Sequence, residues 1–561
     1  MVAAVAIVGS IVIFFKLGDC RTLGSHEAYA VVPAREMLQS GNWIVPSYGG
    51  IPRLEKPPFG YWLVATAAWL FGGFHEWVVR LPAAVSAIVL AILVAMWATR
   101  IYGRNVGLAA ALVQLTSVWT MEYGRKAEVD MFLCLLTTLA MILISGHNRT
   151  EMRLKAFWRW VAIYVVLSVA WMAKFHFATA MVLTPCIVYF LIERRFRSLL
   201  HLANPIGLML LTVSVVTWPY LVLQHIPDAW QIWMQQTVGR ATGEIGSEPV
   251  WFFIPHTFVL MLPWSPFAIH AVPDSWRRAW KQCDAHERFL WVWFCTQFAI
   301  CTISAGKHRN YILPVLPVLS VLVSRSLVAC IERVRQKQPI LRWHAAVGSM
   351  LTVMAIGATT WFVVVNNWTY LSDATLFVVS LFAVGTFATT WLLVANRPLT
   401  AGCGAILTFV LCYMAVVGWL LPGRDYRMTA ARFGQSIRSN GLSGRDICVY
   451  RQGKAPIVFY LGDPVYRIES VDELRARLNR DNELLIVTDT GNAADLSTVG
   501  TLRILKKMTS SIGAAPHKGP DGRPALVLGR LSSSKEQVSI LPDEVMRGGL
   551  EKLPHSSPSR R

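Results

Sequence analysis

The sequence predicts a polytopic α-helical membrane protein with about 13 transmembrane helices, followed by a small C-terminal α/β domain. Of the 561 residues, 54% are hydrophobic and only 15% are charged, and the mean hydropathy is +0.44. Soluble domains carry about 25% charged residues. Apolar runs recur along the chain, and a membrane-spanning helix needs about 20 such residues. The composition therefore excludes an ordinary soluble enzyme.

The basic residues orient the predicted helices. The chain has 53 Lys and Arg against 33 Asp and Glu, a formal net charge of +20. No basic module with interleaved aromatic residues is present, which argues against a nucleic-acid partner. The basic residues instead fall in every second loop, at 100–104, 149–159, 194–197, 277–281 and 333–337. The positive-inside rule assigns these loops to the cytoplasm, so the segment 18–76 and the tail after residue 421 face outside.

The apolar runs define a membrane domain over residues 1–421. The first run, 2–15, lacks the basic flank and cleavage site of a signal peptide, so we expect an uncleaved span. Whether the N-terminus is truncated stays open. The ten cysteines show no metal-ligand spacing, and those in or beside apolar runs are expected to be small buried hydrophobes: Cys134, Cys186, Cys295, Cys301, Cys330, Cys403 and Cys412. The later runs lie roughly at 77–99, 105–121, 129–145, 158–173, 177–192, 204–223, 254–273, 288–304, 310–330, 345–365, 374–395 and 403–421.

Near Pro422 the long apolar runs end, and shorter strand-like and helix-like segments follow. DICVY, ELLIVTD and ALVLGRL have the composition of buried strands, whereas DYRMTAARFGQSIRS and VDELRARLN have helical spacing. Residues 422–531 are therefore predicted to form a soluble α/β domain on the outer side, large enough for its own core. Residues 532–561 are rich in Ser, Pro and Arg and are predicted to be disordered.

A carboxylate opens the first long outer loop, 18–76. Glu27 starts the stretch HEAYAVVPAREMLQS, whose spacing predicts an amphipathic helix at the outer membrane interface. A carboxylate held there can act as a general base or as a metal ligand. The alternative is an acid that only stabilises the N-terminus of its helix through the dipole.

The same loop contains PRLEKPPFGYWLVA, which places Lys56 at the start of a helix. Pro57 and Pro58 suit a first helical turn, and a helix N-terminus favours anions. Lysine is a compact donor for a phosphate. Glu55 would orient Lys56 or hold a metal, and Tyr61 enters the interface with its aromatic neighbours. The alternative is a lysine that extends to lipid headgroups.

Further polar groups occur at the outer ends of predicted spans. Asp130 begins a span, where a carboxylate is costly unless it is paired or functional. Arg240 lies in one outer loop, and Tyr311 lies in another within AGKHRNYILPVLP. An ion pathway would instead bury charges near mid-membrane. The pattern predicts an outer-surface site for an anionic, lipid-linked compound. A flippase or transporter of lipid-linked sugar is the alternative, although it would need access from both faces.

Several stretches together resemble one family. HEAYAVVPAREMLQSGNWIVP, GIPRLEKPPFGYWLVA, RLPAAVSA, EVDMFLCLLTTLA, LPWSPF and YILPVLPVL are similar to segments of the aminoarabinose lipid A transferase and bacterial dolichyl-phosphate-mannose-protein mannosyltransferase-like group. LEKPP is specific in this position, whereas YILP alone is weak, and the resemblance covers roughly residues 1–325. It implies the GT-C fold and the transfer of a sugar from a polyprenyl phosphate to an acceptor outside the membrane.

The resemblance also implies roles for single residues. Lys56 matches the family lysine that contacts the lipid phosphate, and Glu55 matches its neighbour. Asp130 matches the second family acid. Arg240 resembles the arginine of the long outer loop, and Tyr311 matches the tyrosine of YILP and is grouped with the phosphate-binding residues.

The chain departs from the family at its first acid. The family loop usually begins with an Asp-Glu pair, and here His26 precedes Glu27. Glu27 is thus the remaining candidate for the catalytic or metal-associated carboxylate, and a non-catalytic relative becomes a further alternative. The need for a divalent metal stays open, with Glu27 and Glu55 as candidate ligands.

Two further departures follow. Lys174 resembles the lysine of a family TKG turn, but Phe175 stands in place of the glycine. Gln236 and Thr237 stand where the family has a histidine, which argues against a metal shared between that loop and Glu55.

The implied protein is an inverting glycosyltransferase of the bacterial inner membrane, with its active site and tail in the periplasm. Lys56, Arg240 and Lys174 would hold the phosphate of a polyprenyl-phosphate-linked sugar donor. Glu27, helped by Asp130, would accept the proton of the acceptor hydroxyl. The acceptor would be a lipid, a glycan or a protein.

Overall fold

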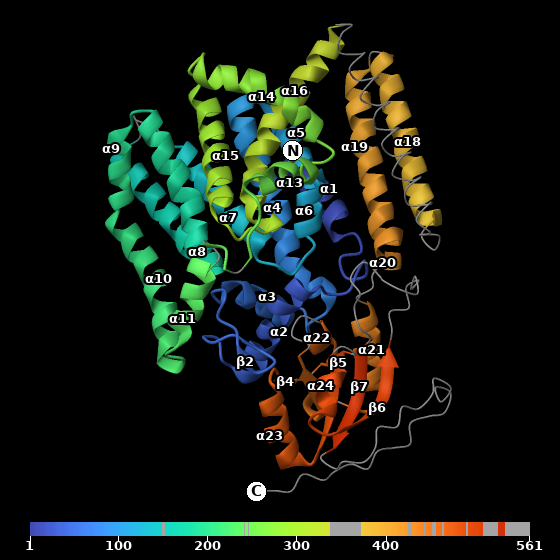
Figure 1. Ribbon diagram of the computed structural model, residues 1–561. Helices are drawn as coiled ribbons and strands as arrows, with labels where there is room; N and C mark the ends of the chain where they lie inside the picture. The colour runs from blue at the N-terminus through green and yellow to red at the C-terminus, as the bar shows by residue number, and fades with distance from the viewer. Residues whose placement is uncertain are drawn as a thin grey trace. The chain divides into compact units, whose positions relative to one another are not determined.

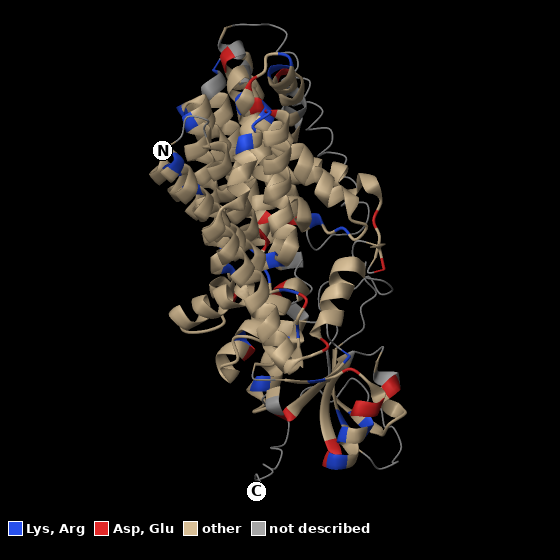
Figure 2. Cartoon of the chain, turned by 90° about the vertical axis from the view of Figure 1, so that its left-hand side faces the viewer, with Lys and Arg blue, Asp and Glu red and all other residues tan. Residues whose placement is uncertain are grey.

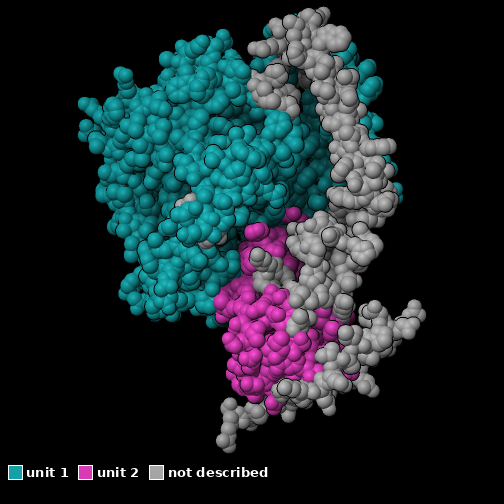
Figure 3. All heavy atoms as spheres, viewed as in Figure 1, with its two compact units in different colours: residues 1–20, 33–46, 52–424 teal, residues 21–32, 47–51, 425–561 magenta. Residues whose placement is uncertain are grey.

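The chain forms two compact units (Figure 3). Unit 1 comprises residues 1–20, 33–46 and 52–424, and unit 2 comprises residues 21–32, 47–51 and 425–561. The expected span 345–365 and the expected disordered tail beyond residue 532 lie outside the described residues. The structure, a computed structural model, describes residues 1–147, 152–239, 242–244, 246–336, 372–395, 397–424, 428–442, 444–451, 456–462, 465–489, 492–508 and 526–532.

Unit 1 is built from helices and short helical turns (Figure 1). In chain order they are α1 (Val2–Phe14), α2 (Ser25–Ser40), α3 (Phe59–Leu70), α4 (Glu76–Tyr102), α5 (Arg104–Thr116), α6 (Val118–Tyr123), α7 (Asp130–Ser145), α8 (Arg153–Ile192), α9 (Phe196–Leu199), η1 (Leu200–Ala203), α10 (Pro205–His225), α11 (Ala229–Met234), η2 (Gln235–Gly239), η3 (Val250–Phe252), α13 (Phe253–Leu260), α14 (Ser265–Trp280), α15 (Ala285–Ile303), η4 (Arg309–Val315), α16 (Leu316–Arg335), α18 (Ser372–Val394), α19 (Pro398–Ala415), η6 (Val416–Leu420) and α20 (Leu421–Arg424). The first part of α2, up to residue 32, belongs to unit 2.

Within the described residues, six helices are long and apolar enough to cross a membrane: Glu76–Tyr102, Arg153–Ile192, Pro205–His225, Arg309–Ala329, Asp373–Leu392 and Thr400–Leu420. Shorter apolar helices occupy Val2–Phe14, Phe59–Leu70, Asp130–Ser145 and Val250–Leu260. Long stretches of helix carry no Lys, Arg, Asp or Glu (Figure 2). The chain is thus a multi-pass membrane protein.

Two runs that were each predicted to form one span are divided into two helices. The run 105–121 divides into α5 and α6 at Ser117, and the run 254–273 divides into α13 and α14. Pro263 lies in the second break, and α14 has a proline in its first turn. Proline lacks the N–H that a continuing helix needs, so apolar composition alone does not sustain one helix here. The carbonyl of Leu262 accepts a hydrogen bond from the Val118 N–H of α6 at 3.0 Å instead.

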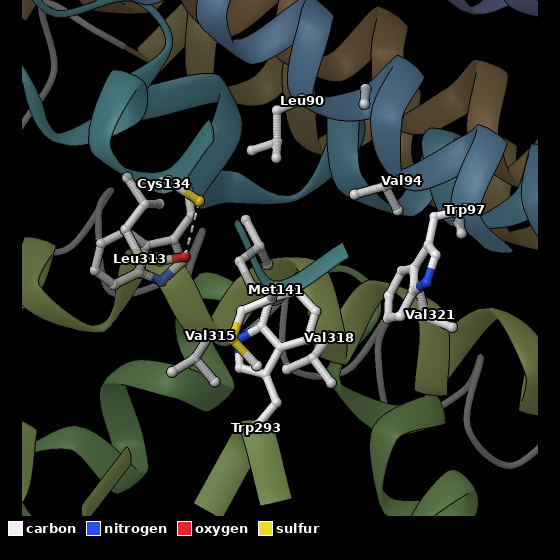
Figure 4. Close-up of a cluster of buried hydrophobic side chains, with 14 of the residues drawn as sticks. Leu90, Val94, Trp97, Cys134, Met141, Trp293, Leu313, Val315, Val318 and Val321 are labelled. Atoms are coloured by element: carbon white, nitrogen blue, oxygen red, sulfur yellow. Dashed lines mark hydrogen bonds between the residues drawn. The ribbon is translucent and has the colours of Figure 1, made fainter. Parts of the chain in front are cut away.

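The core of unit 1 lies among α4, α7, α15, η4 and α16 (Figure 4). Trp97 of α4 and Trp293 of α15 lie with their ring centroids 5.6 Å apart, next to Met141 of α7. The Cys134 thiol of α7 donates to the carbonyl of Leu313 at 3.4 Å, the contact drawn as a dashed line. Because lipid tails are as apolar as these side chains, close van der Waals packing is what favours association of the helices.

Two buried arginines donate hydrogen bonds to backbone carbonyls at the end of α1 and just after it. Arg80 is 0% exposed and donates to the carbonyl of Leu17 at 2.8 Å. Arg125 is 3% exposed and donates to the carbonyls of Ile13 at 2.6 Å and Lys16 at 3.1 Å. The last carbonyls of a helix have no partner within it, and cations near that end are favoured by the dipole. The Arg125 guanidinium therefore caps α1, and Arg80 fixes the chain that follows the helix.

Unit 2 holds a five-stranded mixed sheet in the order β4-β3-β5-β7-β6. β3 is parallel to β4 and β5, whereas β7 is antiparallel to β5 and β6. The side chains of Leu474 and Leu478 on α23 join the buried core of the strands. The elements are α21 (Met428–Ser439), η7 (Gly444–Asp446), β3 (Ile447–Tyr450), α22 (Ile457–Tyr460), β4 (Tyr466–Ile468), α23 (Val471–Asp481), β5 (Glu483–Asp489), α24 (Ala493–Ser497), β6 (Thr501–Met508) and β7 (Leu526–Ser532), with a short hairpin of β1 (Ser47–Tyr48) and β2 (Ile51–Pro52).

Candidate functional site

The predicted site residues divide between the two units. His26 and Glu27 belong to unit 2, and Arg240 lies outside the described residues. Those in unit 1 are Glu55, Lys56, Tyr61, Asp130, Lys174 and Tyr311.

The centre of the unit 1 group is a buried ion pair. Asp130 is the first residue of α7 and is 2% exposed. The Lys174 ammonium donates to Asp130 Oδ1 at 2.5 Å, and the Lys174 side chain is 12% exposed. The Asn310 side chain of η4 also lies beside this carboxylate. The predicted catalytic acid and the predicted phosphate-binding lysine are therefore direct partners, which the sequence did not indicate.

A kink inside α8 presents Lys174 to this pair. The helical φ and ψ angles are interrupted at Lys174 (−154° and 39°) and Phe175 (50° and −150°), so that two helices meet there. A positive φ with this ψ is essentially a glycine conformation and costs other residues roughly 1–3 kcal/mol. The Phe175 ring offsets this cost by packing against Trp171, Trp218 and Trp233 at centroid distances of 5.4, 5.8 and 6.4 Å.

The same tryptophans hold the loop before Lys56. Trp233 Nε1 donates to the carbonyl of Leu54 at 3.0 Å, and Trp218 Nε1 donates to that of Ile44 at 2.9 Å. Leu54 itself is 1% exposed. The indole N–H of a buried tryptophan normally donates to a hydrogen-bond acceptor of this kind. One aromatic cluster thus supports both the kink at Phe175 and the loop that carries Lys56.

Helix α3 brings Lys56 toward the start of α7. Pro58 is the N-cap residue of α3, so both prolines precede the helix and do not lie in its first turn as predicted, although Lys56 does stand close to a helix start. Gly60 allows a close approach, because a Cβ added there would lie 3.2 Å from the Val129 side chain. The rings of Phe59 and Phe132 stack at 5.5 Å across the same contact. The N-terminal ends of α3 and α7 are therefore neighbours.

Lys56 shares the electrostatic environment of the ion pair. Burial lowers the pKa of Lys56 below the ordinary lysine value, and the charges of Lys174 and Arg53 lower it further. The Asp130 and Glu128 carboxylates act in the opposite direction and raise this pKa. Lys56 and Lys174 thus both act on the buried Asp130 carboxylate, and Glu128 adds a second carboxylate to the same electrostatic environment.

Glu55 and Tyr61 act with a partner that sequence reasoning missed. The Arg53 guanidinium donates to Glu55 Oε1 at 3.1 Å and also hydrogen-bonds the Tyr61 side chain. Tyr61 is 4% exposed. Arg53 lies in the same PRLEK stretch, so its charge beside Glu55 was the signal that could have found it.

The Tyr311 ring faces the Lys174 ammonium. Lys174 Nζ lies 4.4 Å from the centroid of Tyr311 and 5.3 Å from that of Phe177. The two rings are 5.4 Å apart. Aromatic faces attract cations, more strongly when the pair is desolvated. Tyr311 therefore stabilises the charge that Lys174 brings to the site.

Glu27 holds the first turn of α2 in unit 2. It is 2% exposed, and its Oε2 accepts a hydrogen bond from the Gly24 N–H at 2.8 Å. This is the reach of a third helical residue back to the N-cap position, as in a capping box. The interpretation of Glu27 as a helix-stabilising acid is thus correct for one oxygen, and the same contact fixes the orientation of the carboxylate. His26 beside it is exposed.

The described residues offer no ready metal site. Among them, no group of three or more His, Cys, Asp and Glu side chains lies close enough to hold an ion. The two candidate ligands have other contacts, because Glu55 pairs with Arg53 and Glu27 caps α2. The described part of the chain therefore does not assemble a divalent-metal site.

Part of the chain matches a known family. The model of the dolichyl-phosphate-mannose-protein mannosyltransferase family matches residues 55–222. This segment contains Glu55, Lys56, Tyr61, Asp130 and Lys174. The match therefore covers the whole buried ion pair and the lysine beside it.

Curated relatives are similar over a longer stretch. The undecaprenyl phosphate-alpha-4-amino-4-deoxy-L-arabinose arabinosyl transferase of Edwardsiella ictaluri is 29% identical over 296 residues, 52% of this chain and 53% of that protein. The transferase of the same name from Pseudomonas savastanoi pv. phaseolicola is 27% identical over 330 residues, 58% of this chain and 60% of that protein. The chain thus spans somewhat more than half the length of the curated relatives it matches.

The fold is shared with a solved structure. The crystal structure of ArnT from Cupriavidus metallidurans bound to undecaprenyl phosphate superposes with a TM-score of 0.75 at 20% identity, covering 96% of this chain and 98% of that one. The fold is therefore that of the GT-C membrane glycosyltransferases. Together these comparisons confirm the resemblance stated from the sequence.

Proposed function

We propose that this relative of the aminoarabinose lipid A transferases and protein mannosyltransferases is itself a membrane glycosyltransferase that uses a polyprenyl-phosphate-linked sugar. The observation that supports the proposal most is the buried Asp130–Lys174 ion pair, with Lys56 in its electrostatic environment, inside the family-matched segment. The names of the relatives suggest undecaprenyl phosphate-α-4-amino-4-deoxy-L-arabinose as the first donor to test.

The proposed reaction is a single displacement at the anomeric carbon. The oxygen of an acceptor hydroxyl forms the new bond to that carbon, while the bond from the carbon to the phosphate oxygen breaks. The hydroxyl proton passes to the Glu27 carboxylate, and the bonding electrons leave with the polyprenyl phosphate. One displacement inverts the anomeric configuration.

The lysines act on the leaving group. Negative charge grows on the phosphate as the bond to the sugar breaks, and fixed cations in a partly dehydrated site stabilise that charge. Lys56 is the proposed direct contact. Lys174 is held by Asp130 and Tyr311, so it contributes charge at a fixed place, and Asp130 helps by positioning it. Arg240 is proposed as a further phosphate contact.

The proposed cellular setting is the bacterial inner membrane, with about 13 spans over residues 1–421 and with the site and the segment 422–531 in the periplasm. The distribution of Lys and Arg over alternate loops supports this orientation.

The acceptor is a hydroxyl or phosphate of a lipid, glycan or protein. Mass spectrometry of outer-surface glycolipids and glycoproteins from cells with and without the protein tests the function. A sugar mass lost with the protein supports the proposal, and unchanged spectra together with an inactive purified protein contradict it.

Lys56→Ala is expected to weaken the binding of undecaprenyl phosphate by about 10- to 100-fold, since a hydrogen bond to a charged group contributes about 1.5–3 kcal/mol. Lys56 binds the phosphate as the protonated ammonium. The affinity for undecaprenyl phosphate should therefore be highest below the lowered pKa of Lys56 and fall as the pH rises through it. That fall should come at a lower pH than for an ordinary lysine of pKa 10.5. Titration of the purified protein with undecaprenyl phosphate across pH measures both effects.

Lys56→Arg and Lys126→Ala serve as controls for this titration. Arginine stays protonated, so Lys56→Arg should abolish the alkaline fall. Lys126 pairs with Glu122 at 2.5 Å, and its loss should leave affinity unchanged. Wild-type affinity in Lys56→Ala would show that Lys56 does not hold the phosphate.

The orientation is checked with single-cysteine proteins. Asp472 lies on α23, its side chain is 94% exposed, and Asp472→Cys should react with an impermeant maleimide in intact spheroplasts. The native Cys283 is exposed in a predicted cytoplasmic loop and should react only after the membrane is permeabilised. The reverse pattern would overturn the topology.

A further inference from the structure

The backbone immediately before Glu27 is held by the C-terminal part of the chain. The Leu23 N–H donates to the Tyr460 hydroxyl at 2.9 Å, although the two residues are 437 positions apart. Leu23 is 0% exposed and Tyr460 is 6% exposed, so water does not readily replace this hydrogen bond. The adjoining Gly24 N–H is the donor to the Glu27 carboxylate. Two consecutive N–H groups thus fix the start of α2, one through Tyr460 and one through Glu27.

A second contact holds the same helix from the β1–β2 hairpin. The ring of Tyr29 packs against that of Tyr48 at 5.1 Å. Arg467 of β4 donates to the Tyr48 carbonyl at 3.3 Å, and its guanidinium carbon lies 4.9 Å from the Tyr48 ring centroid. Gly49 has a φ of +63°, and a Cβ added there would lie 2.4 Å from Arg467 Cδ. Only glycine permits this close approach.

We propose that Tyr460 of α22 and Arg467 of β4 are positioning residues for Glu27, so that the C-terminal segment of unit 2 takes part in catalysis by orienting the base. This inference rests on the proposed function of Glu27. Residues 21–32, 47–51 and the C-terminal segment form one compact unit, while the proposed phosphate contacts Lys56 and Lys174 belong to the other. Loss of a positioning contact should therefore reduce the rate of transfer without weakening donor binding.

Tyr460→Phe removes one hydroxyl and keeps the ring. In the full-length protein reconstituted in phospholipid vesicles, we expect kcat to fall about 10- to 100-fold, because small displacements of a catalytic group cost that much. The KM for the donor and the unfolding temperature should stay near wild type. Tyr466→Phe is the matched control: Tyr466 lies on β4, is 43% exposed, and its hydroxyl bonds Glu473 at 3.1 Å. It should retain wild-type kcat.

A double-mutant cycle tests whether Tyr460 acts through Glu27. The double variant Glu27→Gln/Tyr460→Phe should be no slower than Glu27→Gln alone, because the contact has nothing left to position. Additive losses would overturn the proposal, as would wild-type kcat in Tyr460→Phe.

Hydrogen–deuterium exchange gives a readout that does not depend on activity. Amides in the segment 21–32 should exchange faster in Tyr460→Phe than in wild type, and Tyr466→Phe should show no change there. Unchanged exchange in Tyr460→Phe refutes the positioning role even if the protein transfers no sugar. An inactive wild-type protein with faster exchange in Tyr460→Phe would instead refute the proposed function and leave the structural contact established.

Discussion

Glu27→Gln is expected to lower kcat by about 10²–10⁴-fold while leaving the affinity for the polyprenyl-phosphate donor unchanged. A general base contributes a factor of this size, and glutamine keeps the shape of the side chain but cannot take the proton. Glutamine can still accept the hydrogen bond from Gly24, so α2 should remain intact. Single-turnover transfer and donor titration, measured on the same preparation, separate the two effects.

The neighbouring residue provides the companion variant. His26→Asp restores the Asp-Glu pair that is usual in the family and should leave the enzyme active or make it faster. If Glu27→Gln keeps full activity while Asp130→Asn abolishes it, Asp130 becomes the base. Wild-type transfer in both variants would remove general-base catalysis by either acid from the mechanism.

Lys174→Met is expected to destabilise the protein by about 3–5 kcal/mol, because it leaves the Asp130 carboxylate buried without its cation. The double variant Asp130→Asn/Lys174→Met should recover much of this loss, since neither charge then remains. Reversible denaturant unfolding in detergent micelles measures the differences. Lys126→Met breaks a more exposed pair and should cost less than about 1 kcal/mol. Equal losses for Lys174→Met and Lys126→Met would show that the Asp130–Lys174 pair does not stabilise the fold.

The sequence indicated which charged residues at the ends of apolar runs could be functional. It did not indicate which of them contact one another. Lys56 and Asp130 stand out because a charge beside an apolar run needs a reason. The contact between Asp130 and Lys174 depends on the kink in α8. The predicted spans 158–173 and 177–192 are separated at this kink, but the sequence did not indicate which residue Lys174 contacts there. Phenylalanine is a poor residue for the backbone angles of Phe175, and its place there is explained by packing against Trp171 of the same helix and against the distant Trp218 and Trp233.

Strand composition predicted the buried strands of unit 2 and failed at one edge of the sheet, strand β6. The runs ICVY, ELLIVTD and LVLGRL coincide with β3, β5 and β7, which lie inside the sheet. β6 is an edge strand, and Arg503, Lys506 and Lys507 interrupt its apolar pattern. Charged residues on an edge strand prevent pairing with other chains, and they also conceal the strand from a composition-based prediction.

That Glu27 belongs to unit 2 could likewise not be predicted from the sequence. Its helix is separated from Tyr460 by most of the membrane domain, and no periodicity links the two segments. A backbone N–H that bonds a tyrosine hydroxyl leaves no pattern in the residues on either side. Contacts of this kind are known only from coordinates.

The arginine cap on α1 has a consequence for biosynthesis. The first helix leaves the ribosome with its last carbonyls unsatisfied, and their donor Arg125 follows 112 residues after Ile13. Until Arg125 has been translated, those carbonyls must bond water at the membrane surface. Helix α1 can therefore enter the bilayer early but can dock only after α4 and α6 have been made. Truncated reporter fusions that end before Arg125 would record the insertion of α1 and miss its final packing.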